Sequence, residues 1–305
     1  MPYLNSYIPE PPLARADWHA ATPVNEYDLN FVFDLPPRLE TEGVRLEPVI
    51  PSVHGQQLFR LFSAWPAGLD YLPYGPFPDF TSFLTFLEDR RRRSNCLMFA
   101  VYDLGLEFDP GADLSIEEDT HADAGGLRPE RIAGVVGLIT TPDFRMAELG
   151  PLHLADPFQR THVLTHSIWL LLDWIFASPS ATGRRGLGLR RAQWGAHASN
   201  SASIQAAQRI GFELETAHAA WERPLRHDSK AGRIELPAFV EADPEWSERE
   251  REIGWGRHSA MLGMGWDRWH EGGGKERIRA LVQRGVVRRE ASDVLGLSTL
   301  SVRDT

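Results

Sequence analysis

The stretch from Trp194 to Glu213 constrains the fold of this chain more than any other part of its sequence. A β-like run ends at a turn containing Asn200, Ser203 falls in the first turn of an alanine-rich helix, and Gly211-Phe212 leads into another strand. Glycine is favoured directly after a helix because it adopts left-handed dihedrals without steric cost. The free N–H groups and dipole at such a helix start favour ligand oxygens or a thiolate. Plain helix capping by Asn200 and Ser203, which needs no ligand, explains the same residues.

Predicted strands and helices alternate along the rest of the chain. Alternating or continuous apolar patterns predict strands, and apolar residues at helical spacing predict helices. The strands are expected at 43–50, 97–102, 131–139, 147–154, after 186–194, at 212–223 and finally at 256–265. The helices are expected at 53–62, at 79–92 with Asp79 as N-cap, at 163–176, at 202–210 and, weakly, at 267–284. This order predicts one compact α/β domain of about 180 to 200 residues, within the usual range of domain sizes.

The predicted core spans residues 43–225 and is surrounded by less regular segments. Residues 1–42 form a proline-rich arm, and residues 107–130 form an acidic, turn-rich insertion that we expect to be exposed. Residues 226–284 are interpreted as a C-terminal extension that completes the domain, and residues 285–305 as a polar tail.

Charge and cysteine content narrow the class of protein. A formal net charge of −10 disfavours binding to nucleic acid through phosphates, and Arg90–Arg93 are interpreted as a helix end rather than a basic patch. The single cysteine, Cys96, lies in a predicted buried strand and excludes an intramolecular disulfide. No zinc-site spacing is present, so no metal is expected. The N-terminus has no signal-peptide pattern, and the apolar run at 168–177 is too short to span a bilayer. We therefore expect a cytoplasmic protein.

The pattern from Asn200 to Phe212 resembles that of GNAT N-acetyltransferases, particularly the RimJ/RimL-like branch. The resemblance covers residues 43–225, is strongest at 131–214, and includes Leu72–Phe77 and Ala147–Gly150. It implies an α/β fold with a central mixed, mostly antiparallel sheet flanked by helices. It also implies one splayed strand pair that holds the thioester, expected at Val135–Thr140 and Glu148–Leu154.

The coenzyme A loop departs from the usual family pattern, Gln/Arg-x-x-Gly-x-Gly/Ala. Here Gln159 is kept, but His162 and Leu164 stand at the positions of the small residues. The Gln-Arg-Thr-His-Val sequence resembles a fungal-type variant of the family. Backbone N–H groups in helical conformation need no glycine to bind phosphate, and side chains of this loop could add donors. The resemblance implies an acetyl-CoA site formed by Leu152, His153, Leu154, Gln159, Arg160, Thr161, His162, Val163, Leu164, Thr165, Asn200 and Ser203.

Amine acylation by a thioester needs a base for the amine and benefits from a proton donor for the leaving thiolate. The resemblance points to Glu148 as the base, although a surface or salt-bridged glutamate explains it equally well. Ser203 is the candidate proton donor, because the usual tyrosine is not evident. His153 is a second candidate base, since histidine titrates near neutrality, or else a core residue.

The expected acceptor side consists of Trp65, Tyr71, Tyr74 and Phe77, together with the segment 255–269. These aromatics either line an apolar pocket or simply pack. We expect transfer of acetyl from acetyl-CoA to the amine of a small molecule or peptide, with no nucleic-acid or membrane partner. Two alternatives stay open, a ligand-binding or regulatory protein and a different acyl or non-acyl reaction. The oligomeric state also stays open, with a homodimer as one alternative.

Overall fold

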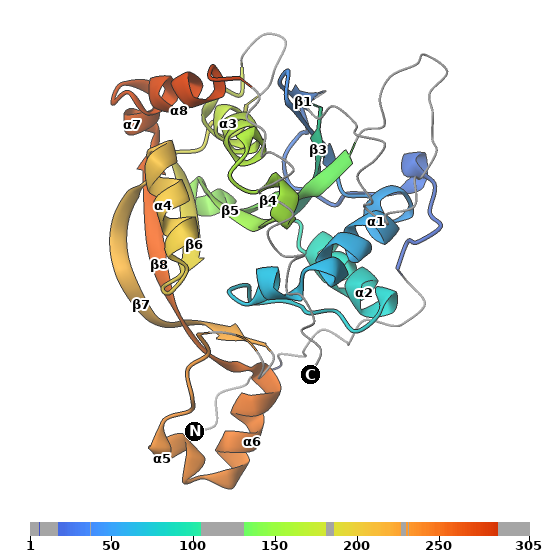
Figure 1. The fold of residues 1–305 in the computed structure, drawn as a ribbon, viewed down its shortest axis with the longest axis vertical. Coiled ribbons are helices and arrows are strands. Elements are labelled where there is room, and N and C mark those ends of the chain that lie inside the picture. The colour runs from blue at the N-terminus through green and yellow to red at the C-terminus, as the bar shows by residue number, and fades with distance from the viewer. Residues whose placement is uncertain are drawn as a thin grey trace, which may run out of the picture.

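The computed structural model describes Ser6, residues 18–36, 38–104, 131–180, 186–226, Lys230 and residues 232–285. Most of the predicted arm, the predicted insertion at 107–130 and the predicted tail beyond residue 285 lie outside the described residues. Within the described part, eight strands form one sheet in the order β1-β2-β3-β4-β5-β6-β8-β7 (Figure 1). The strands are β1 Leu39–Glu40, β2 Val44–Pro48, β3 Cys96–Asp103, β4 Arg131–Thr141, β5 Met146–Leu154, β6 Arg191–His197, β7 Glu213–Leu225 and β8 Trp255–Gly265.

Helices cover the central strands from both sides. In Figure 1, α1 and α2 lie together on one side, whereas α3, α4, α7 and α8 gather on the other. The long β7–β8 pair extends away from them and ends beside α5 and α6. The helices are α1 Pro51–Ala64, α2 Phe80–Arg91, α3 His162–Phe176, α4 Ser201–Ile210, α5 Ala238–Glu241, α6 Pro244–Ile253, α7 Trp266–His270 and α8 Gly274–Val282. Short 3-10 turns lie at η1 Val24–Glu26, η2 Pro66–Leu69, η3 Pro142–Phe144 and η4 Asp156–Phe158.

Local signals placed several of these elements correctly. Asp79 caps α2, because its carboxylate accepts a hydrogen bond from the Ser82 N–H at 2.7 Å. Gly211 follows α4 with a φ of +125°, a conformation that suits glycine. The last strand is present as β8. The weak final helix is two helices, α7 and α8, because Gly273 adopts a left-handed conformation between them.

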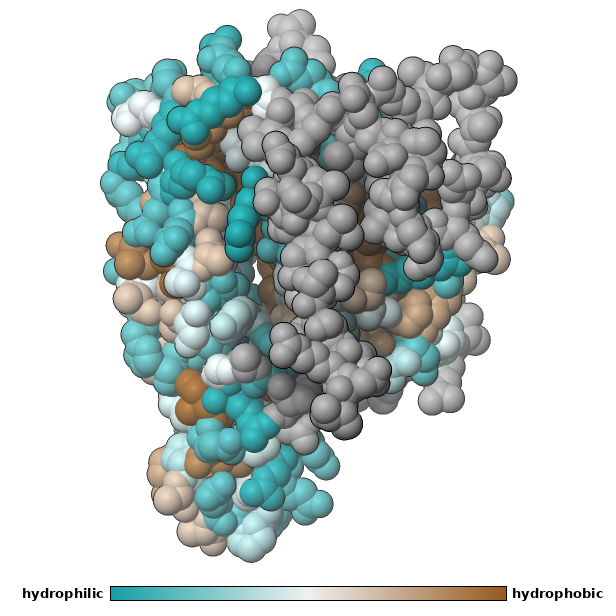
Figure 2. Space-filling view, in the orientation of Figure 1, coloured by the Kyte–Doolittle hydropathy of each residue, from teal (hydrophilic) through white to brown (hydrophobic). Residues whose placement is uncertain are grey.

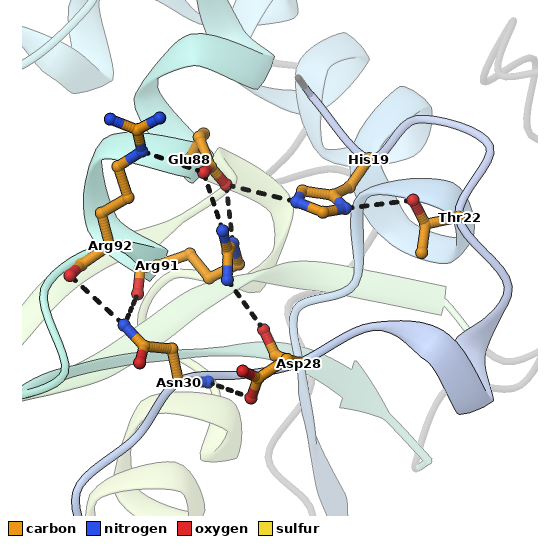
Figure 3. Close-up of polar contacts among 7 residues, drawn as sticks. All are labelled: His19, Thr22, Asp28, Asn30, Glu88, Arg91 and Arg92. Atoms are coloured by element: carbon orange, nitrogen blue, oxygen red, sulfur yellow. Dashed lines mark hydrogen bonds and ion pairs between the residues drawn. The ribbon is translucent and has the colours of Figure 1, made fainter. Parts of the chain in front are cut away.

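The described part of the N-terminal arm is tied to the end of α2 through Glu88 (Figure 3). Glu88 is buried and accepts hydrogen bonds from Arg91 at 2.7 and 2.8 Å and from Arg92 at 3.2 Å. From the arm, His19 lies 3.8 Å from the same carboxylate, and the Asn30 side chain donates to the Arg91 carbonyl at 2.9 Å. The arginine run is therefore a helix end that anchors the arm.

The sheet parts between β5 and β6, not where the sequence analysis expected. The predicted splay between 135–140 and 148–154 is wrong, because β4 and β5 stay paired from Gly134–Leu154 to Thr141–Met146. These two strands form a hairpin, and its short turn holds them together. By contrast, β5 and β6 are parallel, are joined through α3, and pair over only three residues each, 146–148 with 191–193. A long crossover lets two strands separate where a hairpin cannot.

The core lies along α3, whose buried side chains include Ile168, Leu171 and Trp174. No helix in the described residues is long and apolar enough to cross a membrane. The face in Figure 2 is predominantly hydrophilic where α6 and α8 are visible, with only small apolar patches between them. In the C-terminal region Trp269 is fully buried, whereas Phe239, Trp246, Ile253 and Trp266 are exposed.

Candidate functional site

The separation of β5 from β6 places a carboxylate at the mouth of the gap. Glu148 is the last β5 residue in the parallel pairing, opposite Gln193. A Cβ atom on Gly195 would lie 3.2 Å from Oε1 of Glu148 and 3.8 Å from Cε of Met261. The Glu148 carboxylate therefore lies over β6 at Gly195, and the missing side chain there provides its space.

Arg223 of β7 holds this carboxylate. Its Nη2 atom donates to both oxygens of Glu148 at 2.7 Å, and its Nε atom donates to Glu222 at 2.8 Å. The second Glu222 oxygen accepts from the Ser259 hydroxyl at 2.8 Å. Burial would lower the pKa of Arg223, but the charges of Glu148 and Glu222 outweigh it and raise that pKa. The salt-bridged state that the sequence left open for Glu148 is thus present, and its role as base stays a prediction.

His153 does not have the properties of a base that titrates near neutrality. Its ring lies between Phe62, at a centroid distance of 4.5 Å, and Trp65, at 5.8 Å. The side chain is buried, and its Nε2 atom has no hydrogen-bond partner in the described part of the chain. Burial lowers the pKa of His153 to about 4. Of the two alternatives that the sequence left open for His153, these aromatic surroundings favour the core residue, because they disfavour the charged ring.

The other predicted acceptor-side aromatics differ in their surroundings. The Tyr71 ring lies 5.1 Å from His197 at the end of β6. Tyr74 is buried, its Oη atom has no hydrogen-bond partner among the described residues, and burial raises its pKa. Phe77 packs against Phe62 at 5.9 Å and belongs to an aromatic cluster. Packing therefore accounts for Phe77, whereas Tyr71 lies beside the end of β6 and Tyr74 packs against Phe86 of α2 with an unpartnered hydroxyl.

A buried lysine connects this loop to the C-terminal extension. Lys230 donates three hydrogen bonds, to the carbonyl oxygens of Leu69 at 3.0 Å, Leu72 at 2.6 Å and Tyr74 at 2.6 Å. Its side chain is buried, which lowers the pKa of Lys230 to about 8. The lysine thus fixes the loop that carries Tyr71 and Tyr74.

The predicted diphosphate loop leads directly into α3. Thr161 is the N-cap, and its hydroxyl accepts from the Val163 N–H at 3.3 Å. Arg160 has a φ of +60°, and the Gln159 side chain donates to the Leu154 carbonyl at 3.0 Å. The first N–H groups of a helix have no partner within it, so this turn presents main-chain donors at the end of β5.

His162 points into the protein, away from the role in phosphate binding that the sequence suggested for its side chain. Its Nε2 atom lies 3.1 Å from the Gly43 carbonyl and 3.2 Å from Oδ1 of Asp103. A Cβ atom on Gly43 would lie 2.7 Å from Cδ2 of His162. The imidazole is buried, and so is Thr165. The larger residue at this position is therefore accommodated inward, where Gly43 provides its space.

The remaining predicted donor-side residues line or support the same region. Asn200 caps α4, because its side chain accepts from the Ser203 N–H at 3.1 Å. The Ser203 hydroxyl oxygen accepts from Nε1 of Trp194 at 3.0 Å, which leaves its own proton free to donate elsewhere. Val163 and Leu154 are core residues, and Leu152 and Leu164 pack against that core.

The sequence analysis missed Arg223, Glu222, Arg257 and Lys230. Two signals pointed to them. Arg257 begins a polar run, Arg257-His258-Ser259, in a strand whose other residues are apolar or glycine, and Lys230 and Lys275 are the only lysines in an arginine-rich chain. Cys96 is buried, and burial raises its pKa, so it behaves as the predicted core residue. Among the described residues, no group of three His, Cys, Asp or Glu side chains could hold a metal ion.

Comparison with known proteins identifies the fold. Residues 90–213 match the family model described as the Acetyltransferase (GNAT) domain. A structure from Chromobacterium violaceum, described as a probable acetyltransferase of the GNAT family, has a TM-score of 0.55 and 21% identity, covering 87% of this chain and 99% of its own. A GCN5-related N-acetyltransferase from Brucella melitensis has a TM-score of 0.55 and 19% identity, covering 82% and 89%.

The searches of curated proteins and of solved structures gave different results. No curated protein matches the sequence. At such low identity, the structural likeness shows the fold alone. The chain has the predicted GNAT fold, an α/β arrangement with a mostly antiparallel mixed sheet flanked by helices, and its residues 90–213 match the GNAT acetyltransferase domain model.

Proposed function

We propose that this chain, which carries a GNAT acetyltransferase domain, transfers an acetyl group from acetyl-CoA to an amine. The separation of β5 and β6 after three paired residues carries the proposal. It leaves main-chain polar groups of both strands available to a thioester, because each buried N–H or C=O group needs a partner. The carboxylate of Glu148 lies at the mouth of the same gap.

The donor would lie between the two helix starts that follow these strands. Main-chain N–H groups at the start of α3 would bind the diphosphate, with Arg160 and Thr161 adding side-chain donors. Gln159, His162, Val163, Leu164 and Thr165 would shape this turn, and Leu152, His153 and Leu154 would flank the acyl arm. Asn200 would hold the start of α4, near the sulfur.

In the reaction, the amine nitrogen attacks the thioester carbonyl carbon. The new C–N bond forms as Glu148 accepts the amine proton, directly or through water. The C–S bond then breaks, and Ser203 donates a proton to the departing thiolate. Polarisation of the carbonyl by main-chain N–H groups would stabilise the oxyanion. The ion pair with Arg223 leaves lone pairs on Glu148, since a carboxylate has about four acceptor sites.

Further features of the function are proposed on the sequence resemblance. The acceptor is the amine of a small molecule or peptide, near Trp65, Tyr71, Tyr74 and Phe77. The chain belongs to the RimJ/RimL-like branch, with the fungal-type Gln-Arg-Thr-His-Val loop, and works in the cytoplasm. A homodimer is one of the assemblies to test.

Thermal unfolding with acetyl-CoA, CoA and longer acyl-CoAs tests the proposal. A ligand that binds only the folded protein stabilises it by about 2.7 kcal/mol at 100 times its Kd. We expect a dose-dependent rise in Tm with acetyl-CoA, and release of free CoA when an amine is added. A rise without CoA release for any amine would favour the alternative, a ligand-binding or regulatory protein. A rise in Tm only with a longer acyl-CoA would assign that acyl-CoA as the donor. No rise in Tm at millimolar ligand would contradict the proposal.

A further inference from the structure

Arg257 of β8 is a buried cation that forms no ion pair with any of the described residues. Its side chain is 3% exposed, and its Nη1 atom donates only to the Tyr71 carbonyl, at 3.3 Å. Its Nε atom is buried and has no hydrogen-bond partner, and no ion pair joins it to a carboxylate in the described part of the chain. A buried guanidinium with an unused donor is costly in a ligand-free protein.

The nearby carboxylates are already bound by Arg223. Arg223 and Arg257 lie directly opposite each other in the β7–β8 pair. Glu148 accepts both of its short hydrogen bonds from Arg223, and Glu222 is shared between Arg223 and Ser259. Burial and the charge of Arg223 lower the pKa of Arg257 to about 10, in spite of both carboxylates. The guanidinium of Arg257 thus remains under-compensated.

A second unsatisfied donor lies on the loop that Arg257 contacts through the Tyr71 carbonyl. Tyr74 Oη is buried without a hydrogen-bond partner among the described residues. Arg257 donates to the Tyr71 carbonyl, three residues before Tyr74 on the same loop. Burial raises the pKa of Tyr74, and the charges of Arg90 and then of Arg257 act against this rise. Lys230 fixes the loop on which Tyr74 lies through its bond to the Tyr74 carbonyl. A protonated phenol and a guanidinium together suit a carboxylate.

We propose that the acceptor is an amine that also carries a carboxylate, and that Arg257 and Tyr74 bind this carboxylate while the amine faces Glu148. The inference rests on the proposed acetyl transfer, because it assigns the acceptor of the same site. The ligand supplies the missing anion for Arg257 and an acceptor for the Tyr74 hydroxyl. The chain thereby distinguishes amino acids, or peptides that present a nearby carboxylate, from simple amines.

Charge balance supports a zwitterion over a polycation. Glu148 and Glu222 are bonded to Arg223, whereas Arg257 has no ion pair in the described part of the chain, and its charge adds to burial in lowering the pKa of Lys230. A carboxylate beside Arg257 offsets this buried positive charge, while the ammonium group of the same acceptor faces Glu148. A second ammonium in place of the carboxylate would lie beside Arg257 and be repelled.

Matched acceptors test the inference on the wild-type protein. A series of straight-chain amino acids of increasing length is compared with the corresponding carboxamides, which keep the amine and the shape but lack the charge. We expect kcat/KM to be at least about tenfold higher for the carboxylate of the best-fitting length, since a charge-assisted hydrogen bond contributes about 1.5 to 3 kcal/mol. Equal rates for acid and amide at every length would overturn the inference.

Variants localise the effect. Arg257→Gln should remove the preference for the acid over the amide, Arg257→Lys should keep part of it, and Arg251→Gln on exposed α6 should leave it unchanged. If Arg257→Gln fails to fold, saturation of the wild-type enzyme by straight-chain carboxylates as inhibitors replaces it. Inhibition by carboxylates but not by their amides supports the inference, and equal inhibition contradicts it.

Binding of the donor distinguishes a failure of the proposed acetyl transfer from a failure of the acceptor assignment. If acetyl-CoA does not raise Tm, the proposed acetyl transfer fails. If acetyl-CoA raises Tm and amines are acetylated without regard to the carboxylate, only the inference about the acceptor fails.

Discussion

Buried polar side chains have hydrogen-bond partners at the start of α3, whereas several on the acceptor side of the sheet lack them. At the start of α3, Thr161 caps the helix and His162 contacts the Gly43 carbonyl and Asp103. On the acceptor side, Tyr74 and Arg257 each bury a polar atom that has no hydrogen-bond partner among the described residues, and so does His153 near the end of β5. In the first region the Thr161 and His162 side chains are bound within the chain, and only main-chain N–H groups are left for the donor, whereas in the second region polar side-chain atoms are left for a ligand.

This difference has an energetic meaning. A buried polar atom without a partner costs about 1 to 3 kcal/mol, so folding alone does not favour such atoms. Partnered groups stabilise the fold, and their loss should appear first in unfolding. Unpartnered groups are available to bind a ligand, and their loss should appear first in turnover or in pH dependence. Variants in the two regions can therefore be sorted by the measurement that they change.

The largest effect is expected at Glu148. Glu148→Gln keeps the shape and one acceptor for Arg223 but removes the base, so kcat/KM should fall by about 10²- to 10⁴-fold. Steady-state release of CoA measures it, while the Tm rise with acetyl-CoA should stay close to that of the wild type. Glu215→Gln, which changes the exposed partner of Arg191 on β7, is the matched control. Full activity of Glu148→Gln would reduce Glu148 to a structural partner of Arg223.

Glu148 could be predicted from the sequence, but its environment could not. The position of Glu148 on a strand follows from local alternation, and the capped starts of α2 and α4 follow from Asp79 and Asn200. Arg223 reaches it only because β7 pairs with β8 through three register shifts between Leu214 and Arg223. Bulges of this kind depend on contacts between distant segments and leave no periodic signal.

The splay was misplaced for a related reason. Strand propensity identifies β4, β5 and β6, but it does not say which neighbours stay paired. The short turn at Pro142–Phe144 holds β4 to β5, and the crossover through α3 lets β5 leave β6. Topology, rather than residue type, therefore decides where the gap opens. His162 shows the same limit, because its burial depends on Gly43, far away in the sequence.

The next effect concerns pH and distinguishes His153 from a catalytic base. Its pKa of about 4 in the folded protein lies below the 6.5 of the unfolded chain, so the unfolded state binds the proton first. Stability should fall by up to about 3 kcal/mol as the pH drops from 6.5 to 4, and this contribution should then level off. Urea unfolding across this range measures the loss, and His153→Gln should lack it. An unchanged slope in His153→Gln would mean that the ring is solvated in the folded state.

A smaller effect is expected at Gly43 and His162, where a buried side chain has its hydrogen-bond partners within the chain. Gly43→Ala places a methyl group 2.7 Å from Cδ2 of His162, which should destabilise the fold by about 1 to 3 kcal/mol. In a His162→Ala background the same change should cost much less, because the clashing ring is absent. Urea unfolding of the four proteins gives the coupling energy. Additive effects would show that the two residues are not packed together, and the contrast between the two regions would weaken.

The smallest effect is expected at Ser203, which has both a partnered N–H group and a hydroxyl proton without a partner. Its N–H group completes the cap of α4, whereas its hydroxyl proton is left over after the oxygen accepts from Trp194. Ser203→Ala keeps the N–H and removes the proton donor, so Tm should change little while kcat falls by about tenfold or less, since a thiolate leaves readily even without protonation. The drop in kcat should be largest at high pH, where water and buffer protonate the thiolate least. A loss of Tm with unchanged kcat would instead give Ser203 a purely structural role, because its hydroxyl would then act only as the acceptor for Trp194.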